Sequence, residues 1–158
     1  MALKNRMVGR IDGETNFAAR DFIVGSGVTV NEGDFVYFAS GVVTNATVAG
    51  ARLLGMAMGT ATGNAGGTVK VTVCVDPNMV YLIDNDNIGT TFASTHVGTS
   101  FDLIGATGAQ LVDTSTTGTT GSVTCVEYNP KIDPVATDTS WGLYVITENA
   151  LFTGTGAQ

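Results

Sequence analysis

The sequence predicts an all-β protein, built as a compact sandwich or barrel of short antiparallel strands. None of its 158 residues lies in a long segment with a helical period. Short apolar runs instead recur at a spacing of roughly 8–12 residues, which is typical of sandwiches and barrels. Clusters of Gly, Asn and Asp separate the runs and favour tight turns. A chain of this length fits one domain that buries roughly 70% of its unfolded surface, so a core can form without metals or disulfides.

The first third of the chain predicts a series of short strands joined by turns. Residues 21–39, DFIVGSGVTVNEGDFVYFA, read as strand, turn, strand, turn, strand. The turn at residues 31–34 contains Asn, Gly and Asp, which adopt turn conformations readily. A Ser-Gly pair at residues 40–41 then predicts a turn into a strand that begins at Val42.

Residues 53–75, LLGMAMGTATGNAGGTVKVTVCV, could be either a phosphate-binding loop or a β-hairpin. A P-loop needs a Lys directly after its last glycine, and none follows Gly67. A dinucleotide-binding loop needs a helix at this point, whereas the chain continues with four valines that alternate with other residues at period two. The stretch therefore predicts a hairpin, with residues 54–58 and 68–75 as strands and residues 63–67 as the loop.

The second half of the chain predicts further short strands and several irregular connections. Two prolines mark one of these connections as extended. The expected strands are residues 80–83, 101–104, 110–113, 122–128 and 142–147. The expected connections are a turn at 76–78, a polar loop at 84–100, a low-complexity turn at 114–121, the proline-containing segment at 129–140 and a loose tail at 153–158.

Charge is scarce and unevenly distributed. Charged residues make up 13% of the chain, about half of the usual ~25%, which indicates a rigid β structure whose surface is partly covered by partners. The net charge of −7 argues against nucleic-acid binding by the body, because phosphate affinity needs clustered Lys and Arg. Four of the seven basic residues nevertheless lie in the first twenty positions, namely Lys4, Arg6, Arg10 and Arg20. We expect an N-terminal arm over residues 1–20, weakly ordered in the free protein, and a single β domain over residues 21–158.

The N-terminal sequence has no apolar run of signal-peptide length, and no stretch reaches the ~18 apolar residues of a membrane span. We therefore expect synthesis in the cytoplasm and no contact with membranes. In that compartment Cys74 and Cys125 are expected to be free thiols that fill apolar space, with a cross-strand disulfide as the alternative.

Candidate catalytic and metal-binding residues are few. His96 is the only histidine, and no spacing in the sequence supplies the partners of a catalytic triad or a zinc site. Residues 84–89, DNDNIG, begin like a calcium loop, but Ile88 occupies position five and Thr95 occupies position twelve, where a bidentate Glu is needed. Trp141 is the only tryptophan and is expected to cap the core at a strand end. These patterns predict a protein that is not an enzyme and needs no cofactor or metal.

The order of strands and turns resembles the capsid decoration, or head cement, proteins of tailed bacteriophages. The resemblance covers roughly residues 28–146 and rests on turn chemistry and strand order, without a diagnostic motif. The segments that carry it are VTVNEGDFV at residues 28–36, LGMA at 54–57 with the glycine-rich loop and valines that follow, VGTSFDL at 97–103, QLVD at 110–113 and GLYV at 142–145.

This resemblance implies a β-tulip-like domain that forms homotrimers on the outer surface of an icosahedral shell. Such a protein is made in the host cytoplasm, binds the major capsid protein and stabilises the virion against the pressure of packaged DNA. A terminal arm commonly reaches across shell subunits in this family. From charge and position we expect the shell contacts at Leu3, Lys4, Arg6, Met7 and Arg10, with Val8 and Ile11 also available to pack. The alternative is an exported β-sandwich adhesion or carbohydrate-binding module, which should expose more aromatic side chains.

Overall fold

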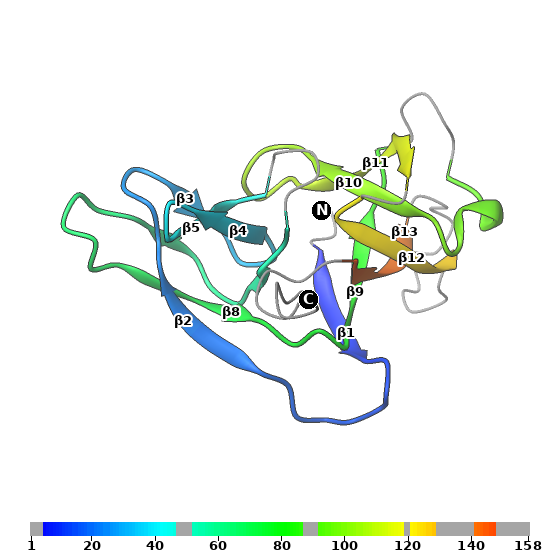
Figure 1. The fold of residues 1–158 in the computed structure, drawn as a ribbon, viewed down its shortest axis with the longest axis horizontal. Helices are drawn as coiled ribbons and strands as arrows, with labels where there is room; N and C mark the ends of the chain where they lie inside the picture. Colours follow the sequence, from blue (N-terminus) through cyan, green and yellow to red (C-terminus); the bar gives the residue numbers. More distant parts are fainter. Residues whose placement is uncertain (1–4, 47–51, 87–91, 119–120, 129–140, 148–158) are drawn as a thin grey trace, which may run out of the picture.

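The computed structural model describes residues 5–46, 52–86, 92–118, 121–128 and 141–147, and these residues are almost entirely β (Figure 1). Helical structure in this part of the chain is limited to the one-turn 3₁₀ helix η1 (Ser94–His96). The strands are β1 (Arg6–Arg10), β2 (Ala19–Ile23), β3 (Thr29–Val30), β4 (Phe35–Ala39), β5 (Val42–Asn45), β6 (Gly55–Ala57), β7 (Ala61–Thr62), β8 (Lys70–Cys74), β9 (Met79–Asp84), β10 (Ser100–Ile104), β11 (Leu111–Gly118), β12 (Val123–Tyr128) and β13 (Trp141–Ile146).

Two antiparallel sheets make up most of the fold. The larger sheet has the strand order β1-β9-β13-β12-β10-β11, and the smaller has the order β2-β8-β6-β4-β5. A separate two-stranded sheet is formed by β3 and β7, and β3 is labelled in the left half of Figure 1. The predicted all-β class with antiparallel strands is confirmed, and the sheets form a sandwich that does not close into a barrel.

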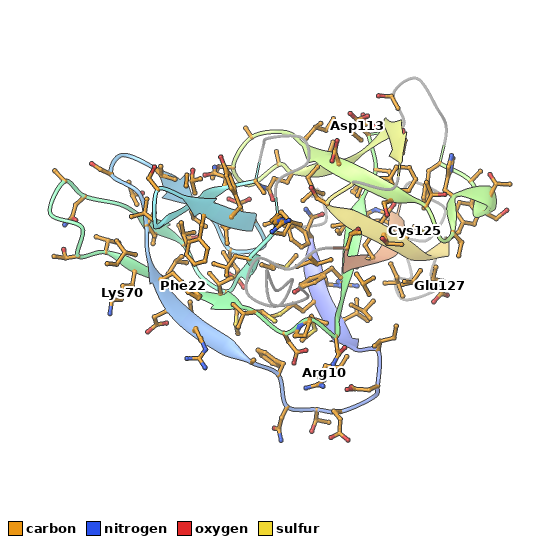
Figure 2. The ribbon with its side chains drawn as sticks, in the orientation of Figure 1. Arg10, Phe22, Lys70, Asp113, Cys125 and Glu127 are labelled. Atoms are coloured by element: carbon orange, nitrogen blue, oxygen red, sulfur yellow. The ribbon has the colours of Figure 1, made fainter. Side chains whose placement is uncertain are left out.

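The glycine-rich stretch forms the predicted hairpin. Strands β6 and β8 pair antiparallel, with Met56 opposite Cys74. In β8, Val71 is buried and Thr72 is exposed, as period two requires. In Figure 2, Lys70 projects away from the body, on the exposed side of this strand. The connection is longer than predicted because it includes β7, whose two residues pair with β3.

Two sequence expectations need correction. Residues 114–118, expected to be a turn, continue β11, because their β-branched threonines favour extended backbone and the strand pairs with β10. The N-terminal segment is extended, but residues 6–10 pair with β9 as the edge strand β1. The expectation of weak order is therefore wrong for residues 6–10. Residues 1–4 lie outside the described residues.

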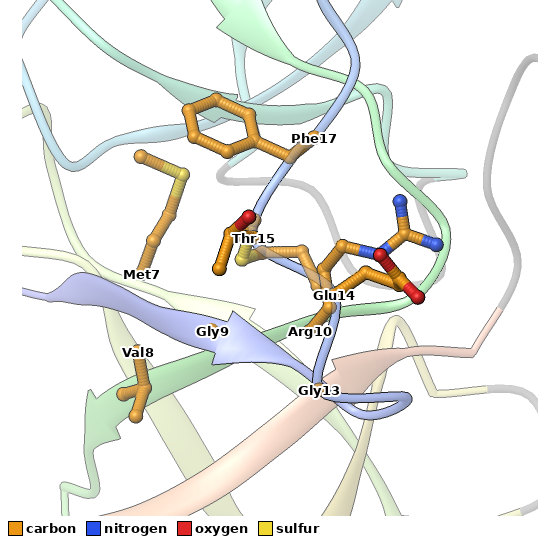
Figure 3. Close-up of a pocket in the computed structure, with 9 residues that line it drawn as sticks. Met7, Val8, Gly9, Arg10, Gly13, Glu14, Thr15 and Phe17 are labelled. Carbon is orange, nitrogen blue, oxygen red and sulfur yellow. The ribbon is translucent and has the colours of Figure 1, made fainter.

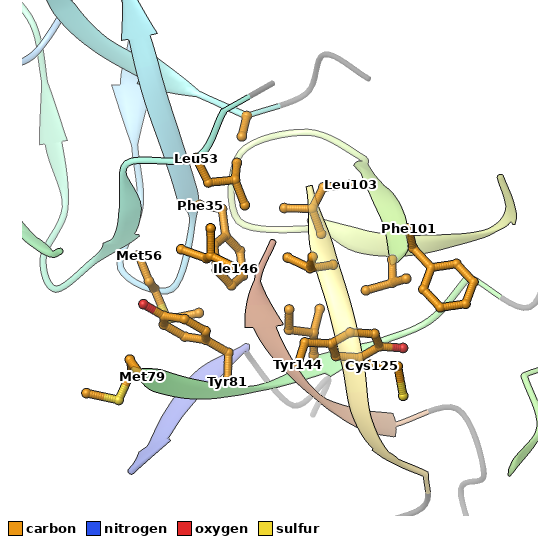
Figure 4. Close-up of a cluster of buried hydrophobic side chains, with 14 of the residues drawn as sticks. Phe35, Leu53, Met56, Met79, Tyr81, Phe101, Leu103, Cys125, Tyr144 and Ile146 are labelled. Carbon is orange, nitrogen blue, oxygen red and sulfur yellow. The ribbon is translucent and has the colours of Figure 1, made fainter. Parts of the chain in front are cut away.

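The main hydrophobic core lies between the two sheets. Side chains from both sheets meet there, and Phe35 of β4 packs edge-on against Tyr81 of β9 with ring centroids 5.0 Å apart. Figure 4 shows this cluster, with Leu53 and Met56 on the side of the smaller sheet and Tyr144 on the larger. A second cluster, mainly valines, fills the other face of the smaller sheet. A third cluster, Val80, Leu82, Trp141 and Leu143, occupies the other face of the larger sheet.

A buried amide links the sheets across this core. Gln110, only 3% exposed, lies just before β11, and its Oε1 accepts a hydrogen bond from the backbone N–H of Phe35 at 2.6 Å. Its Nε2 donates to the carbonyls of Phe35 and Ala46 at 3.0 and 3.4 Å. The amide thus stands in for a direct hydrogen bond between the Phe35 N–H and the carbonyl of Ala46, the residue that follows β5. Nearby, the buried Asp34 accepts hydrogen bonds from the N–H groups of Asn31 and Gly108, at 2.8 and 2.6 Å.

Candidate functional site

Exposed large apolar side chains gather in one segment of the molecule. Among the described residues they are Val8, Ile11, Phe17, Ile23 and Val97, with exposures from 38% to 64%. Single exposed apolar residues are ordinary on protein surfaces. Here, however, four of the five fall between residues 8 and 23, on β1, the following loop and β2. We call this segment, residues 6–23, the N-terminal edge.

Strand β1 holds the first part of the N-terminal edge on the larger sheet. Its register with β9 shifts between Met7 and Gly9, so a bulge interrupts the pairing. Met7 is half-buried and packs against the main core. The Ile11 N–H donates to the Asn78 carbonyl at 2.8 Å, which extends the pairing by one residue and leaves the Ile11 side chain 64% exposed. The chain then turns at Gly13, whose φ of +77° suits glycine, and returns toward β2.

The carboxylate of Asp76, 3% exposed, closes the loop between β1 and β2. Arg10 donates to it from Nη1 at 3.0 Å, and the Ala18 N–H donates at 3.3 Å, so both ends of the loop attach to one side chain. Arg10 also binds Asp12, with Nη2 to Oδ2 at 2.6 Å, and the Asn16 carbonyl at 2.8 Å. The hydrogen bond from Arg10 to Asp12 lowers the pKa of the Asp12 carboxyl group. The loop is therefore fixed in place with its apolar side chains exposed.

A groove of about 500 Å³ runs between β1 and the returning loop. Figure 3 shows Met7 and Phe17 on one side of β1, with Val8 directed to the other side. Glu14 and Thr15 add polar groups to its wall, and Met79 of β9 also lines it. An open, largely apolar groove beside an edge strand is suited to side chains of another protein.

The residues predicted as shell contacts are only partly brought together here. Arg6 is exposed on β1, whereas Met7 is half-buried and Arg10 is held by Asp76 and Asp12. Met7 and Arg10 therefore have structural roles within the chain, whether or not they also contact a partner. Leu3 and Lys4 lie outside the described residues.

Phe17 and Ile23 were not predicted as contact residues, and the structure adds them to the exposed surface with Val8 and Ile11. The available signal was the period-two pattern of the strand after residue 19. Because Phe22 faces the second cluster, its neighbour Ile23 lies on the opposite face of β2, where it is 38% exposed.

His96 has a structural setting. Its Nδ1 accepts a hydrogen bond from the Ala93 N–H at 2.9 Å, within η1. Its ring stacks on Phe92 with centroids 5.7 Å apart and meets the edge of Phe101 at 5.6 Å. The side chain is half-buried, because these two aromatic rings cover it.

The segment that resembles a calcium loop directs its first carboxylates to the protein itself. Asp86 Oδ1 accepts hydrogen bonds from the N–H and Oγ1 of Thr114, at 3.0 and 2.7 Å, and Asp84 Oδ1 accepts one from the Asn85 N–H at 2.9 Å. The rest of this segment, residues 87–91, lies outside the described residues. Where the structure is described, no group of three or more His, Cys, Asp or Glu side chains could hold a metal ion.

Both cysteines are buried free thiols, as predicted. Burial raises the pKa of Cys74, and it raises the pKa of Cys125 to about 11. Trp141, 7% exposed, begins β13 and packs in the third cluster, which agrees with its predicted role at a strand end. None of the described helices is long and apolar enough to cross a membrane.

In comparisons with known proteins, no family model matches the chain, and no curated protein or solved structure matches it.

Proposed function

We propose that the protein is a non-catalytic structural protein of a phage virion, which binds the outer surface of the capsid through its N-terminal edge. In this role it acts as a decoration protein that stabilises the shell against internal pressure, with the major capsid protein as its partner. The observation that carries the proposal is that Val8, Ile11, Phe17 and Ile23 are all exposed along one segment, which also contains exposed Arg6 and Arg20.

Two properties of this surface support the proposal, and assembly as a homotrimer, which is part of the proposal, would add to them. The loop is fixed before any partner arrives, because Asp76 holds both of its ends, so binding costs little ordering entropy. Apolar side chains beside basic ones suit an acidic protein surface, with the apolar contacts supplying most of the affinity. A homotrimer that engages three sites gains by effective concentration, often by a factor of roughly 10² to 10⁴.

The alternative of a carbohydrate-binding module is less well supported. Sugar-binding surfaces use exposed aromatic rings, and Trp141 is buried in the third cluster. Among the described residues, Phe17 is the single aromatic residue in the set of exposed large apolar side chains.

The direct test is binding of the purified chain to expanded, DNA-free heads that lack it, followed by electron microscopy and by heating of the heads. We expect regular density on the outer surface and heads that survive to a higher temperature. Heads that bind no chain and melt unchanged would reject the proposal.

A further inference from the structure

Asp12 and Gly13 form the only Asp-Gly pair in the sequence, which contains no Asn-Gly pair. Such a pair is prone to isomerise, because glycine has no side chain to hinder attack by its own backbone nitrogen. The Gly13 nitrogen bonds to the side-chain carboxyl carbon of Asp12, and the amide proton and the carboxyl OH leave as water. Hydrolysis of the resulting succinimide ring takes the water up again and gives either aspartate or isoaspartate, in which the main chain runs through the side-chain carbon.

Three N–H groups hold the carboxylate that would react. Arg10 binds both of its oxygens, from Nε to Oδ1 at 3.0 Å and from Nη2 to Oδ2 at 2.6 Å. The Glu14 N–H donates to Oδ1 at 3.1 Å. Two-pronged contacts between Arg and a carboxylate are among the strong hydrogen bonds of proteins, and they stabilise the ionised form. Water leaves far more readily from the protonated carboxyl group, so these contacts oppose ring closure at Asp12.

The backbone nitrogen that would attack is held as well. The Gly13 N–H donates to the Arg10 carbonyl at 3.0 Å and closes a turn over residues 10–13. In Figure 3, Gly13 lies at the bend that follows β1. The nitrogen must give up this hydrogen bond and its proton before it can bond to the carboxyl carbon. Arg10 therefore restrains both reacting groups, the carboxylate through its side chain and the amide through its carbonyl.

We propose that Asp12–Gly13 is the site of isoaspartate formation in this chain, and that Arg10 slows the reaction in the folded state. Arg10 can do so because it is itself fixed in place. Its Nη1 donates to Asp76 at 3.0 Å and to the Asn16 carbonyl at 2.8 Å, and its side chain is only 20% exposed. This inference does not depend on the proposed capsid function.

Isomerisation would alter the apolar surface of the N-terminal edge. Isoaspartate adds one carbon to the main chain between residues 12 and 13 and leaves the free carboxylate on the α-carbon. The two-pronged contact with Arg10 is then lost, and the turn closed by Gly13 changes its length. Ile11, 64% exposed, precedes the modified residue directly, and Phe17 follows on the same loop. The modification therefore changes how these two side chains are presented.

The rate of isoaspartate formation in the native chain, compared with the chain unfolded in guanidinium, tests the inference. Trypsin cleaves after Arg10 and Arg20, so Asp12 lies in the peptide IDGETNFAAR. Chromatography separates its aspartate and isoaspartate forms, and the succinimide form is lighter by one water. In the unfolded chain we expect isoaspartate at Asp12 before any other Asp. In the native chain the rate should be at least about tenfold lower, because hydrogen bonds to a charged group must first be broken.

Variants of the full chain separate the contact with Arg10 from general mobility of the loop. Arg10→Gln should speed the reaction about tenfold in the folded state, because it removes both contacts to the Asp12 carboxylate. Arg10→Lys keeps the charge without the two-pronged contact and should give an intermediate rate. The matched control Asp76→Asn weakens the other anchor of Arg10 and should react nearly as slowly as wild type. Asp12→Glu should form no isoaspartate. All rates are measured below the Tm of every variant.

Several results would overturn the inference. One is an equal rate in the native and the unfolded wild-type chain, and another is isoaspartate that appears first at a different Asp. A third is a rate in folded Arg10→Gln, or in Arg10→Lys if the first variant does not fold, that is no higher than in wild type. Equal acceleration by Asp76→Asn would also overturn it, because the rate would then follow the mobility of the loop.

Discussion

Replacement of Gln110 by Leu tests whether one buried amide holds the two sheets together. Leucine has a similar volume and keeps the site filled, but it removes all three hydrogen bonds of the amide. The Phe35 carbonyl remains satisfied, because it also accepts the Ala46 N–H at 2.9 Å. The Phe35 N–H loses its partner, and the leucine side chain prevents it from closing directly onto the Ala46 carbonyl.

The expected cost follows from this count. One buried N–H left without a partner costs about 1–3 kcal/mol of stability. The Ala46 carbonyl also loses the hydrogen bond from Gln110, which adds to this cost. We expect the free energy of unfolding to fall by about 2–3 kcal/mol. For a domain of this size that corresponds to a fall in Tm of roughly 5–10 °C, measured by calorimetry and by urea unfolding. A loss below about 0.5 kcal/mol would refute the proposed role of the amide.

Gln110→Glu adds a pH-dependent control to this experiment. The ionised carboxylate accepts from the Phe35 N–H but repels the carbonyls of Phe35 and Ala46, whereas the protonated form can donate to one of them. The pKa of the new group is therefore raised in the folded state above the value of about 4.3 in the unfolded chain. Relative to wild type, the variant should be nearly as stable below pH ~4 and lose stability as the pH rises through the folded-state pKa. A deficit that is independent of pH would contradict this explanation.

Three further outcomes are expected. Val71→Asp should lower the free energy of unfolding by about 4 kcal/mol or more, because it buries an unpaired charge. The same change at exposed Thr72 should lower it by under about 1 kcal/mol. Equal losses in urea unfolding would show that the strand faces are misassigned. Gly55→Ala should lower the free energy of unfolding by roughly 3 kcal/mol or more, since an added Cβ would lie 1.7 Å from a backbone carbonyl oxygen of β8. As the control, an added Cβ at Gly59 meets nothing within 4 Å, so Gly59→Ala should leave the Tm nearly unchanged. Burial raises the pKa of the Cys125 thiol to about 11. At pH 8 it should therefore react with a disulfide reagent roughly 100-fold more slowly in the native chain than in urea. Similar rates in the two states would contradict its burial.

The sequence predicted the strands wherever local chemistry and tertiary structure agree. In β8, buried Val71 and Val73 alternate with exposed Lys70 and Thr72, so the period-two pattern was directly visible. The turn before β4 was equally visible, because the sequence has a glycine at position 33, and the φ of +90° found there suits glycine.

The remaining features depend on partners that lie far away in the sequence. Strand β1 exists because β9 is available to pair with it, about 70 residues later, and β7 has only two residues. Gln110 lies 75 residues from the backbone that it binds. The link of Arg10 to Asp76, which turns a predicted contact residue into part of the fold, likewise spans 66 residues. No local pattern encodes such contacts.

The central claim is that the N-terminal edge binds the shell, and a comparison of Phe17→Ser with Val97→Ser tests it most directly. Both changes remove an exposed apolar side chain, but Val97 lies next to η1, outside the N-terminal edge. Full burial of such a side chain contributes roughly 1.5–3 kcal/mol, so the 40% of Phe17 that is exposed should contribute about 1 kcal/mol per site.

Binding to expanded heads, measured by co-sedimentation at increasing chain concentration, gives the result. The account predicts that Phe17→Ser weakens binding about fivefold for each engaged site, and by more in a trimer, while Val97→Ser binds like wild type and both variants keep the wild-type Tm. Equal affinity of Phe17→Ser and wild type, or a loss on Val97→Ser instead, would contradict it.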